Sequence, residues 1–524
     1  MGYDLSYTSA AQNSLSTVIA LIPIVWLLVS LGFFKMPAYK ACGAGLLLSL
    51  VIAAAVWKMP YMLVLQAALE GGSLALIPII WVIVSAFFTY NISLNTGAMD
   101  RIKNLMSNLS GDRRIQALAI AWGFGGFLES AAGFGTAVAI PASLLIALKF
   151  DAFSAAIICL IANTVAVAFG VIGIPVTTLA TITELPITAL SLDVVVQLTP
   201  FVLLVPFLIV FSVTKSFAGF KGVLLTTLIA GLSFGVSQFL VAKYIGPELP
   251  AIVGSVVSFA AIIASAKISP PKQEWRFPHE SQQKTKNVDT TGNFKSQLIA
   301  WAPYILLLVL VLGTSKLVPA IHQAASQAQS VVYIYNGPGG KPLYIDWILT
   351  PGTLIMVSAI LGGLIQGMSL RDLTKTFRNT LFQLQKTILT VITIVSMAKI
   401  LGYSGMVGAI AAALAGSTGA FYPIFAPLIG ALGTFITGSD TSANVLFGLL
   451  QKQTALQIGA NPSWIAAANT SGACVGKLIS PQSIAIATTA TNLIGKEGEI
   501  LNLTLRYVGG FVIALGFITY IFAF

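Results

Sequence analysis

Long apolar runs recur along this chain from Val18 to the final residue, Phe524. A helix needs about 20 apolar residues to cross the hydrocarbon core of a bilayer. Soluble domains carry about 25% charged residues, whereas this chain of 524 residues carries 9%. The weak alternating pattern of outer-membrane β-strands is absent from the sequence. These features predict an all-α polytopic membrane protein embedded in a lipid bilayer.

The apolar segments give the expected membrane layout, with about twelve transmembrane helices. They lie near 18–34, 41–57, 71–90, 152–183, 199–214, 222–242, 249–267, 298–317, 347–366, 387–403, 462–492 and 504–524. Two more stretches, 116–148 and 416–452, are apolar but broken near their middle by glycine and polar residues. We interpret these two as re-entrant helical hairpins that enter and leave on the same side.

The basic residues test this layout. Lys and Arg number 28 against 17 Asp and Glu, an excess that in a membrane protein is more typical of cytoplasmic loops than of nucleic-acid binding. With both termini outside, the basic clusters follow the first, third, fifth, seventh and ninth helices and fall on the cytoplasmic side, including the linker loop 268–297. Counting either hairpin as a single crossing would destroy this pattern. The loop 318–346 then lies outside.

An internal repeat connects the two halves, 1–267 and 298–524. "IANTVAVAFGVIGIP" (161–175) and "AANTSGACVGKLISP" (467–481) share Asn, Thr, Gly and Pro at a constant offset and without a gap. Each lies in an apolar segment, 152–183 or 462–492, that follows one of the hairpins. The first hairpin opens to the cytoplasm and the second to the outside, so we predict an inverted-topology repeat with two interrupted helices, as in secondary transporters. Backbone groups freed at such breaks must line a cavity or bind ligand.

At these residues the chain resembles a known family. "GFGGFLESAAGFGTAVAIPASLLIALKF" and "GSDTSANVLFGLLQKQTA", together with "ANTSGACVGKLISPQSIAIA", are similar to the bacterial L-lactate permease family of the ion transporter superfamily. The resemblance implies proton-coupled symport of L-lactate, with glycolate and D-lactate also accepted, in the bacterial plasma (inner) membrane. It further implies an elevator mechanism and often a homodimer.

A lactate anion needs cationic or N–H donors for its carboxylate and a partner for its hydroxyl. The two Asn-Thr positions of the repeat were expected to mark the helix breaks, where new helix N-termini attract anions. The alternative is that these side chains only join packed helices. The predicted substrate-binding residues are Asn163, Thr164, Asn469, Thr470, Ser471, Ser442 and Lys477.

Asp440, Glu129 and Lys399 are predicted to serve proton coupling. Asp440 and Glu129 lie in the two hairpins, where a carboxylate at membrane depth is costly and is functional by default. Lys399 and Lys477 lie within predicted spans and could pair with lactate or with Asp440. The alternatives are a helix-capping role for Asp440, a water-facing hairpin tip for Glu129 and snorkelling lysines.

Other classes of function lack the residues that they need. The two histidines, His279 and His322, lie in loops without partners at metal-ligand spacing, so no metal site, cofactor or enzyme activity is expected. The three cysteines lie far apart in apolar contexts and are interpreted as packing residues. "GPGGKP" (337–342) is interpreted as a turn. A sodium-coupled carrier of a related organic anion remains the alternative, and a passive channel would need a continuous polar pore.

Overall fold

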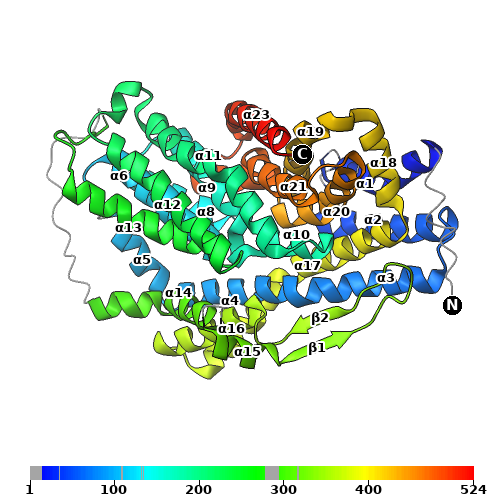
Figure 1. Ribbon diagram of the computed structural model, residues 1–524. Coiled ribbons are helices and arrows are strands. Elements are labelled where there is room, and N and C mark those ends of the chain that lie inside the picture. The colour runs from blue at the N-terminus through cyan, green and yellow to red at the C-terminus, as the bar shows by residue number, and fades with distance from the viewer. Residues whose placement is uncertain are drawn as a thin grey trace.

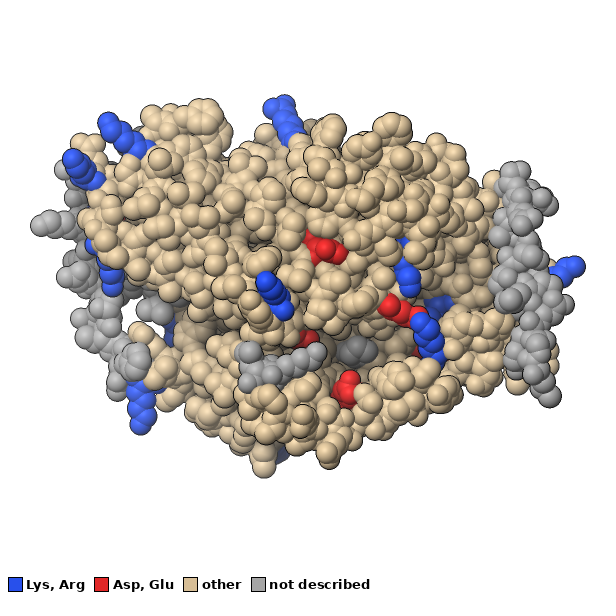
Figure 2. All heavy atoms as spheres, in the orientation of Figure 1, with Lys and Arg blue, Asp and Glu red and all other residues tan. Residues whose placement is uncertain are grey.

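The computed structural model describes residues 14–524 except 33, 35, 108, 109, 132, 134, 278–293 and 315–317. Ten helices in this described part are long and apolar enough to cross a membrane. Figure 2 shows that charged side chains are sparse on the face in view, as expected for a surface that lies against lipid. Much of the predicted cytoplasmic loop 268–297, including His279, lies outside the described residues.

Most of the hydrophobic core falls into two clusters, which we use to group the helices into two bodies. The two bodies also pack against each other, since Ile172, Ile252 and Leu446 of the second body belong to the cluster of the first. The first body, which we call the frame, contains α1 (Ser14–Gly32), α2 (Ala38–Ala55), α3 (Tyr61–Leu74), η3 (Ala75–Ile80), α4 (Trp81–Asn95), α14 (Phe294–Thr314), α15 (Pro319–Ser326), α16 (Pro351–Ile365), α17 (Leu370–Tyr403) and α18 (Met406–Thr418). In Figure 1, α3 and α4 follow one another along one side of the molecule; α4 contacts α16, which in turn contacts α14. The short helix α5 (Ala98–Ser107) follows α4 and also contacts α14.

The second body, which we call the hairpin body, holds both helical hairpins. Its first part comprises α6 (Arg113–Ala117), η4 (Leu118–Phe124), α7 (Gly125–Ala131), α8 (Thr136–Ala147), α9 (Ala152–Ala166), η5 (Val167–Phe169), α10 (Gly170–Thr183), α11 (Ile187–Thr214), η6 (Phe217–Phe220), α12 (Leu224–Tyr244) and α13 (Pro250–Ile268). Its second part comprises η7 (Gly419–Phe421), α19 (Tyr422–Thr437), α20 (Asp440–Ile458), α21 (Pro462–Gly476), η8 (Lys477–Ile479), α22 (Pro481–Ala490) and α23 (Glu497–Ile521).

Both helical hairpins are formed in the hairpin body. The first runs from α6 to α8, close to the predicted 116–148, and Gly135 at φ 88° precedes α8. The second pairs α19 with α20 and turns at Gly438, whose φ is 73°. It begins later than the predicted 416–452 because residues 406–418 form a separate helix, α18, that ends at Gly419. A glycine at each turn allows a positive φ without a steric cost.

The two helix breaks lie beyond the predicted positions. Asn163 and Thr164 sit inside the continuous helix α9, and Asn469, Thr470 and Ser471 sit inside α21. The prediction that these Asn-Thr positions break the helices is therefore wrong. A buried Asn or Thr can stay helical when its side chain bonds to a neighbouring helix or to its own preceding turn.

The glycine and proline of the repeat mark the actual breaks. In the first, a 3₁₀ turn leads to Gly170 and then to a left-handed stretch before Pro175. In the second, a 3₁₀ turn leads to Ser480, and α22 begins at Pro481. Proline suits the first turn of a helix because its missing N–H would have had no intrahelical acceptor there. In both halves the break lies between this glycine and this proline, but its backbone differs: Gly170 follows the 3₁₀ turn and is extended, whereas Gly476 is helical and precedes it.

A short antiparallel sheet interrupts the otherwise helical fold. Strands β1 (Gln329–Val332) and β2 (Leu343–Asp346) pair with Gln329 opposite Asp346 and Val332 opposite Leu343. They lie in the segment that was predicted as an outside loop, and "GPGGKP" falls between them. Apolar β-branched and aromatic residues around a glycine-proline turn are typical of such a β-hairpin.

Candidate functional site

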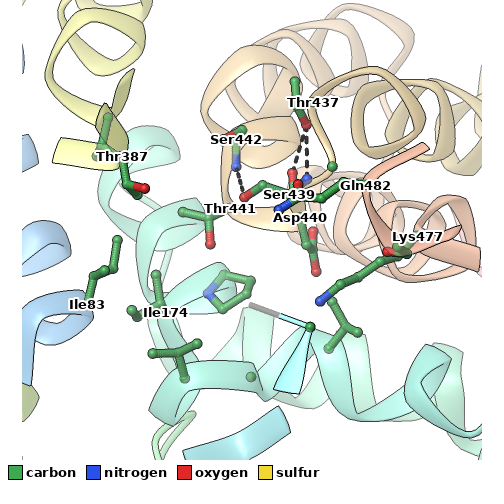
Figure 3. Close-up of a pocket in the computed structure, with 18 of the residues that line it drawn as sticks. Ile83, Ile174, Thr387, Thr437, Ser439, Asp440, Thr441, Ser442, Lys477 and Gln482 are labelled. Atoms are coloured by element: carbon green, nitrogen blue, oxygen red, sulfur yellow. Dashed lines mark hydrogen bonds between the residues drawn. The ribbon is translucent and has the colours of Figure 1, made fainter. Parts of the chain in front are cut away.

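A cavity of about 230 Å³ lies where the hairpin body meets the frame. Its wall combines residues from both hairpins, both helix breaks and three frame helices (Figure 3). The frame contributes Ala38, Ile83, Thr387, Thr390 and Val391; the first half of the hairpin body contributes Glu129, Gly135, Val167, Gly170, Val171, Ile174 and Pro175; the second half contributes Thr437, Gly438, Ser439, Asp440, Thr441, Ser442, Lys477, Gln482, Ser483 and Ile486.

The turn of the second hairpin forms the polar wall of this cavity. The hydroxyl of Thr437 accepts a hydrogen bond from the backbone N–H of Ser439 at 3.2 Å and donates to the carbonyl of Gly433 at 2.8 Å. Ser439 caps α20, since its hydroxyl accepts from the N–H of Ser442 at 3.3 Å. These bonds fix the turn, and Figure 3 shows Asp440 and Thr441 pointing from it toward the centre of the site.

An ion pair crosses the cavity between the two halves of the chain. Nζ of Lys477, just after α21, lies 2.7 Å from Oε1 of Glu129 on α7. The two side chains are 12% and 3% exposed. In the part of the chain that the structure describes, Oε2 of Glu129 has no hydrogen-bond partner. One carboxylate oxygen therefore stays available to a ligand or a proton.

Asp440 lies beside this pair as a second buried carboxyl group. It is 3% exposed, and its Oδ2 accepts a hydrogen bond from the thiol of Cys474 at 3.3 Å. Its Oδ1 has no partner among the described residues. Cys474 was predicted to be a packing residue, and it also contacts the site carboxyl. A buried carboxyl without a full set of partners is costly as an anion, so a ligand group or a proton at Oδ1 would lower this cost.

Three helix starts converge on the cavity. α20 begins at Asp440, α22 begins at Pro481, and α10 becomes regular again near Ile174. Asp440 and Ile174 line the space, as do Gln482 and Ser483 in the first turn of α22. The first N–H groups of a helix have no intrahelical acceptor, and the helix dipole places partial positive charge there. Together with Lys477, these helix starts favour an anion.

Aliphatic side chains form another part of the lining. Val171 and Ile174 come from the first helix break, and Ile83 and Val391 come from frame helices α4 and α17. Figure 3 shows Ile83 and Ile174 across the cavity from Lys477 and Asp440. A site with one charged wall and one aliphatic wall suits a small organic anion that carries an alkyl group.

Four of the predicted site residues meet in this cavity, namely Glu129, Asp440, Ser442 and Lys477. The Asn-Thr positions of the repeat lie elsewhere. Asn469 donates to the side chain of Asn444 at 2.9 Å and accepts from Gln451 at 3.1 Å. The remaining predicted residues make the following contacts: Thr470 donates to Asn444, Ser471 to Gln197 and Thr164 to the carbonyl of Leu160, while Asn163 is 4% exposed.

Lys399 lies in a different cluster within the frame. Its Nζ is 3.0 Å from Oε1 of Glu70, which also accepts a hydrogen bond from the hydroxyl of Tyr403 at 2.6 Å. The ring of Tyr335, which follows β1, stacks on Tyr403 with 3.8 Å between centroids. Lys399 does not line the cavity that holds Glu129 and Asp440. The structure therefore separates it from the other two residues predicted for proton coupling.

Several cavity residues were not predicted. Thr437, Ser439 and Thr441 belong to the hydroxyl-rich turn, so their composition alone could have indicated them. Gln482 and Ser483 follow the second break, where the "SPQS" pattern indicates a helix start. Frame residues such as Ile83, Thr387 and Thr390 carry no local signal, because only the packing of the two bodies places them at the cavity.

Comparison of the sequence with known proteins shows the family of this chain. The L-lactate permease family model matches residues 16–524. The L-lactate permease of Streptococcus iniae is 44% identical over 87% of this chain and 94% of its own length. The glycolate permease GlcA of Escherichia coli is 36% identical over 99% and 97%. The structure of MtrF from Neisseria gonorrhoeae, at 15% identity and TM-score 0.47 over 95% and 97%, is too distant to support an argument. The chain belongs to the L-lactate permease family.

Proposed function

We propose that this multi-pass membrane protein is a secondary active transporter for L-lactate and related small 2-hydroxy monocarboxylates, including glycolate and D-lactate. It carries them together with protons across the bacterial plasma membrane. The observation that carries this proposal is the placement of Lys477, Glu129 and Asp440 in one cavity between the two bodies. The L-lactate and glycolate permeases among its relatives support the substrate class.

The charges in the cavity supply a reason for coupling. One ammonium and two carboxylates give a net charge of −1 when all three are ionised. Adding a substrate anion raises the negative charge in a poorly solvated space, which is strongly unfavourable. A proton on Asp440 or Glu129 offsets this change and frees Lys477 to bind the substrate carboxylate. Transport of one anion with one proton then leaves the charge of the site unchanged.

The chain's own groups suggest how the substrate is oriented. The carboxylate lies between Lys477 and the starts of α20 and α22, where donors are available. The 2-hydroxyl lies against the hydroxyls of Thr441 or Ser442, and the alkyl group faces the apolar wall. We further propose that both hairpins are re-entrant, that the two halves form an inverted repeat, and that the hairpin body moves against the frame as an elevator.

Uptake into proteoliposomes tests this function. Labelled L-lactate should accumulate under an inward proton gradient and should not accumulate under an inward sodium gradient alone. Accumulation driven only by sodium would establish the alternative, in which the hydroxyls and Asp440 of the second hairpin hold Na⁺. Flux that follows the lactate gradient and ignores both cations would indicate a channel and would refute symport.

A further inference from the structure

The first helix break contains an unusual run of backbone conformations. Val171, Ile172 and Gly173 have φ values of 45°, 56° and 76°, so three successive residues are left-handed. Glycine adopts this region freely, whereas a β-branched residue there is a steric outlier. Such strain persists only where the surrounding structure over-determines it, and it is concentrated at functional sites.

The left-handed turn directs its three residues to three different surfaces. Val171 lines the cavity beside Glu129 and Gly170. Ile172 is 1% exposed and lies against the frame, where it lines a small space with Ile79 and Val82. A Cβ on Gly173 would lie 2.2 Å from the carbonyl oxygen of Pro247 in the α12–α13 loop.

Val171 is held firmly in its place at the cavity wall. A Cβ on Gly133, at the turn of the first hairpin, would lie 2.3 Å from Cγ2 of Val171. The hairpin turn therefore packs directly against the side chain of Val171, which is 8% exposed. A glycine at 171 would relieve the backbone strain, so the valine side chain must contribute something that glycine lacks.

We propose that Val171 is a specificity-determining residue, whose side chain contacts the alkyl group of the substrate and limits its size. This proposal rests on the proposed function, since it assumes a small 2-hydroxy acid in the cavity. Val171 shares the cavity lining with Ile174 and Ile83, and Figure 3 shows these two isoleucines across the cavity from Lys477. Strain in the break thus serves substrate selection.

Variants at 171 and 172 test the proposal by two independent readouts. The first is the ratio of initial uptake rates for L-lactate and L-2-hydroxybutanoate, which has one more methylene. V171A and V171G should shift this ratio toward the larger acid by about tenfold, the lower end of what one methylene is worth in a fitted pocket. I172A and I172G share the left-handed backbone but face the frame, and they should leave the ratio unchanged.

The second readout is thermal unfolding of the purified variants. If position 171 is strained, V171G should unfold at a higher temperature than V171A, although alanine buries more apolar surface. An unchanged uptake ratio in folded V171A and V171G would overturn the specificity role, and V171G unfolding below V171A would overturn the strain. If the wild-type protein transports neither acid, the proposed function itself has failed, which separates the two conclusions.

Discussion

Nζ of Lys477 lies 2.7 Å from Oε1 of Glu129, although 348 residues separate the two along the chain. The lysine follows the last turn of α21 and the glutamate sits near the turn of the first hairpin, so the pair joins the two halves of the repeat at the cavity. An ammonium in this position can serve either Glu129 or an anionic substrate. The competition between them is the physical basis of the coupling proposed above.

Lys477→Met should abolish binding of the substrate and not only its accumulation. The variant removes the only cationic side chain in the described cavity lining and leaves Glu129 and Asp440 to repel an anion. Exchange of labelled for unlabelled L-lactate, which needs binding but no gradient, measures this loss. Lys477→Arg keeps the charge and should retain more exchange than Lys477→Met. Equal exchange in Lys477→Met and the wild type would remove Lys477 from the site.

Asp440→Asn should separate exchange from accumulation. The amide resembles a protonated carboxyl in shape and is neutral, so lactate still binds, but position 440 can no longer take up or release a proton. We expect lactate exchange to persist while proton-driven accumulation collapses. Ser442→Ala provides the control in the same turn and should change affinity without uncoupling. Accumulation by Asp440→Asn at the wild-type level and with the same pH dependence would contradict the role of Asp440.

Lys399→Met should destabilise the protein without uncoupling it. The substitution leaves Glu70, which is 3% exposed, without its ammonium partner. Breaking a buried ion pair in this way costs about 3–5 kcal/mol. Thermal unfolding of the purified variant measures the cost, and Glu70→Gln combined with Lys399→Met should recover part of it. Wild-type unfolding together with lost proton coupling would instead support the role that was predicted for Lys399 from the sequence.

Asn469→Ala should also act on stability rather than on affinity. The variant removes hydrogen bonds to Asn444 and Gln451 from a buried network, at a cost of about 0.5–1.5 kcal/mol for each bond lost. Asn444 keeps its bond from Thr470, and Gln451 keeps its bond to the carbonyl of Ala426. We expect a lower unfolding temperature and an unchanged KM for L-lactate in the folded fraction. A KM raised tenfold at the wild-type unfolding temperature would show that Asn469 contacts the substrate after all.

The sequence predicted the hairpins and the two interrupted helices because glycine, proline and charged residues interrupt their apolar runs. Each interruption is visible in the local sequence. It also indicated Glu129, Asp440 and Lys477, because ionisable groups in apolar segments are rare. It misplaced the breaks because Asn163 and Asn469 have polar side chains that a helix can accommodate when tertiary partners exist. The pairing of Lys399 with Glu70 depends on packing within the frame, and the placement of Ile83 at the cavity depends on packing between the two bodies. The local sequence pattern encodes neither.

Glu248 should give the protein a stability that depends on pH. It lies in the loop between α12 and α13, beside Gly173 of the helix break. Burial raises its pKa from 4.5 to about 7, although a hydrogen bond to its own backbone opposes this shift. The folded state thus holds the proton more tightly than the unfolded chain does. Between about pH 4.5 and pH 7, the free energy of unfolding therefore falls as the pH rises.

Glu248→Gln should remove this fall, because the amide does not titrate. Thermal unfolding of the purified protein across the same pH window measures the difference between variant and wild type. The expected result is a variant whose unfolding temperature gains on the wild type as the pH rises to 7. Glu274→Gln, at a glutamate that pairs with Arg276 on the surface, is the matched control and should follow the wild-type profile. Parallel profiles for Glu248→Gln and the wild type would show that this carboxyl is ionised and solvated in the folded protein.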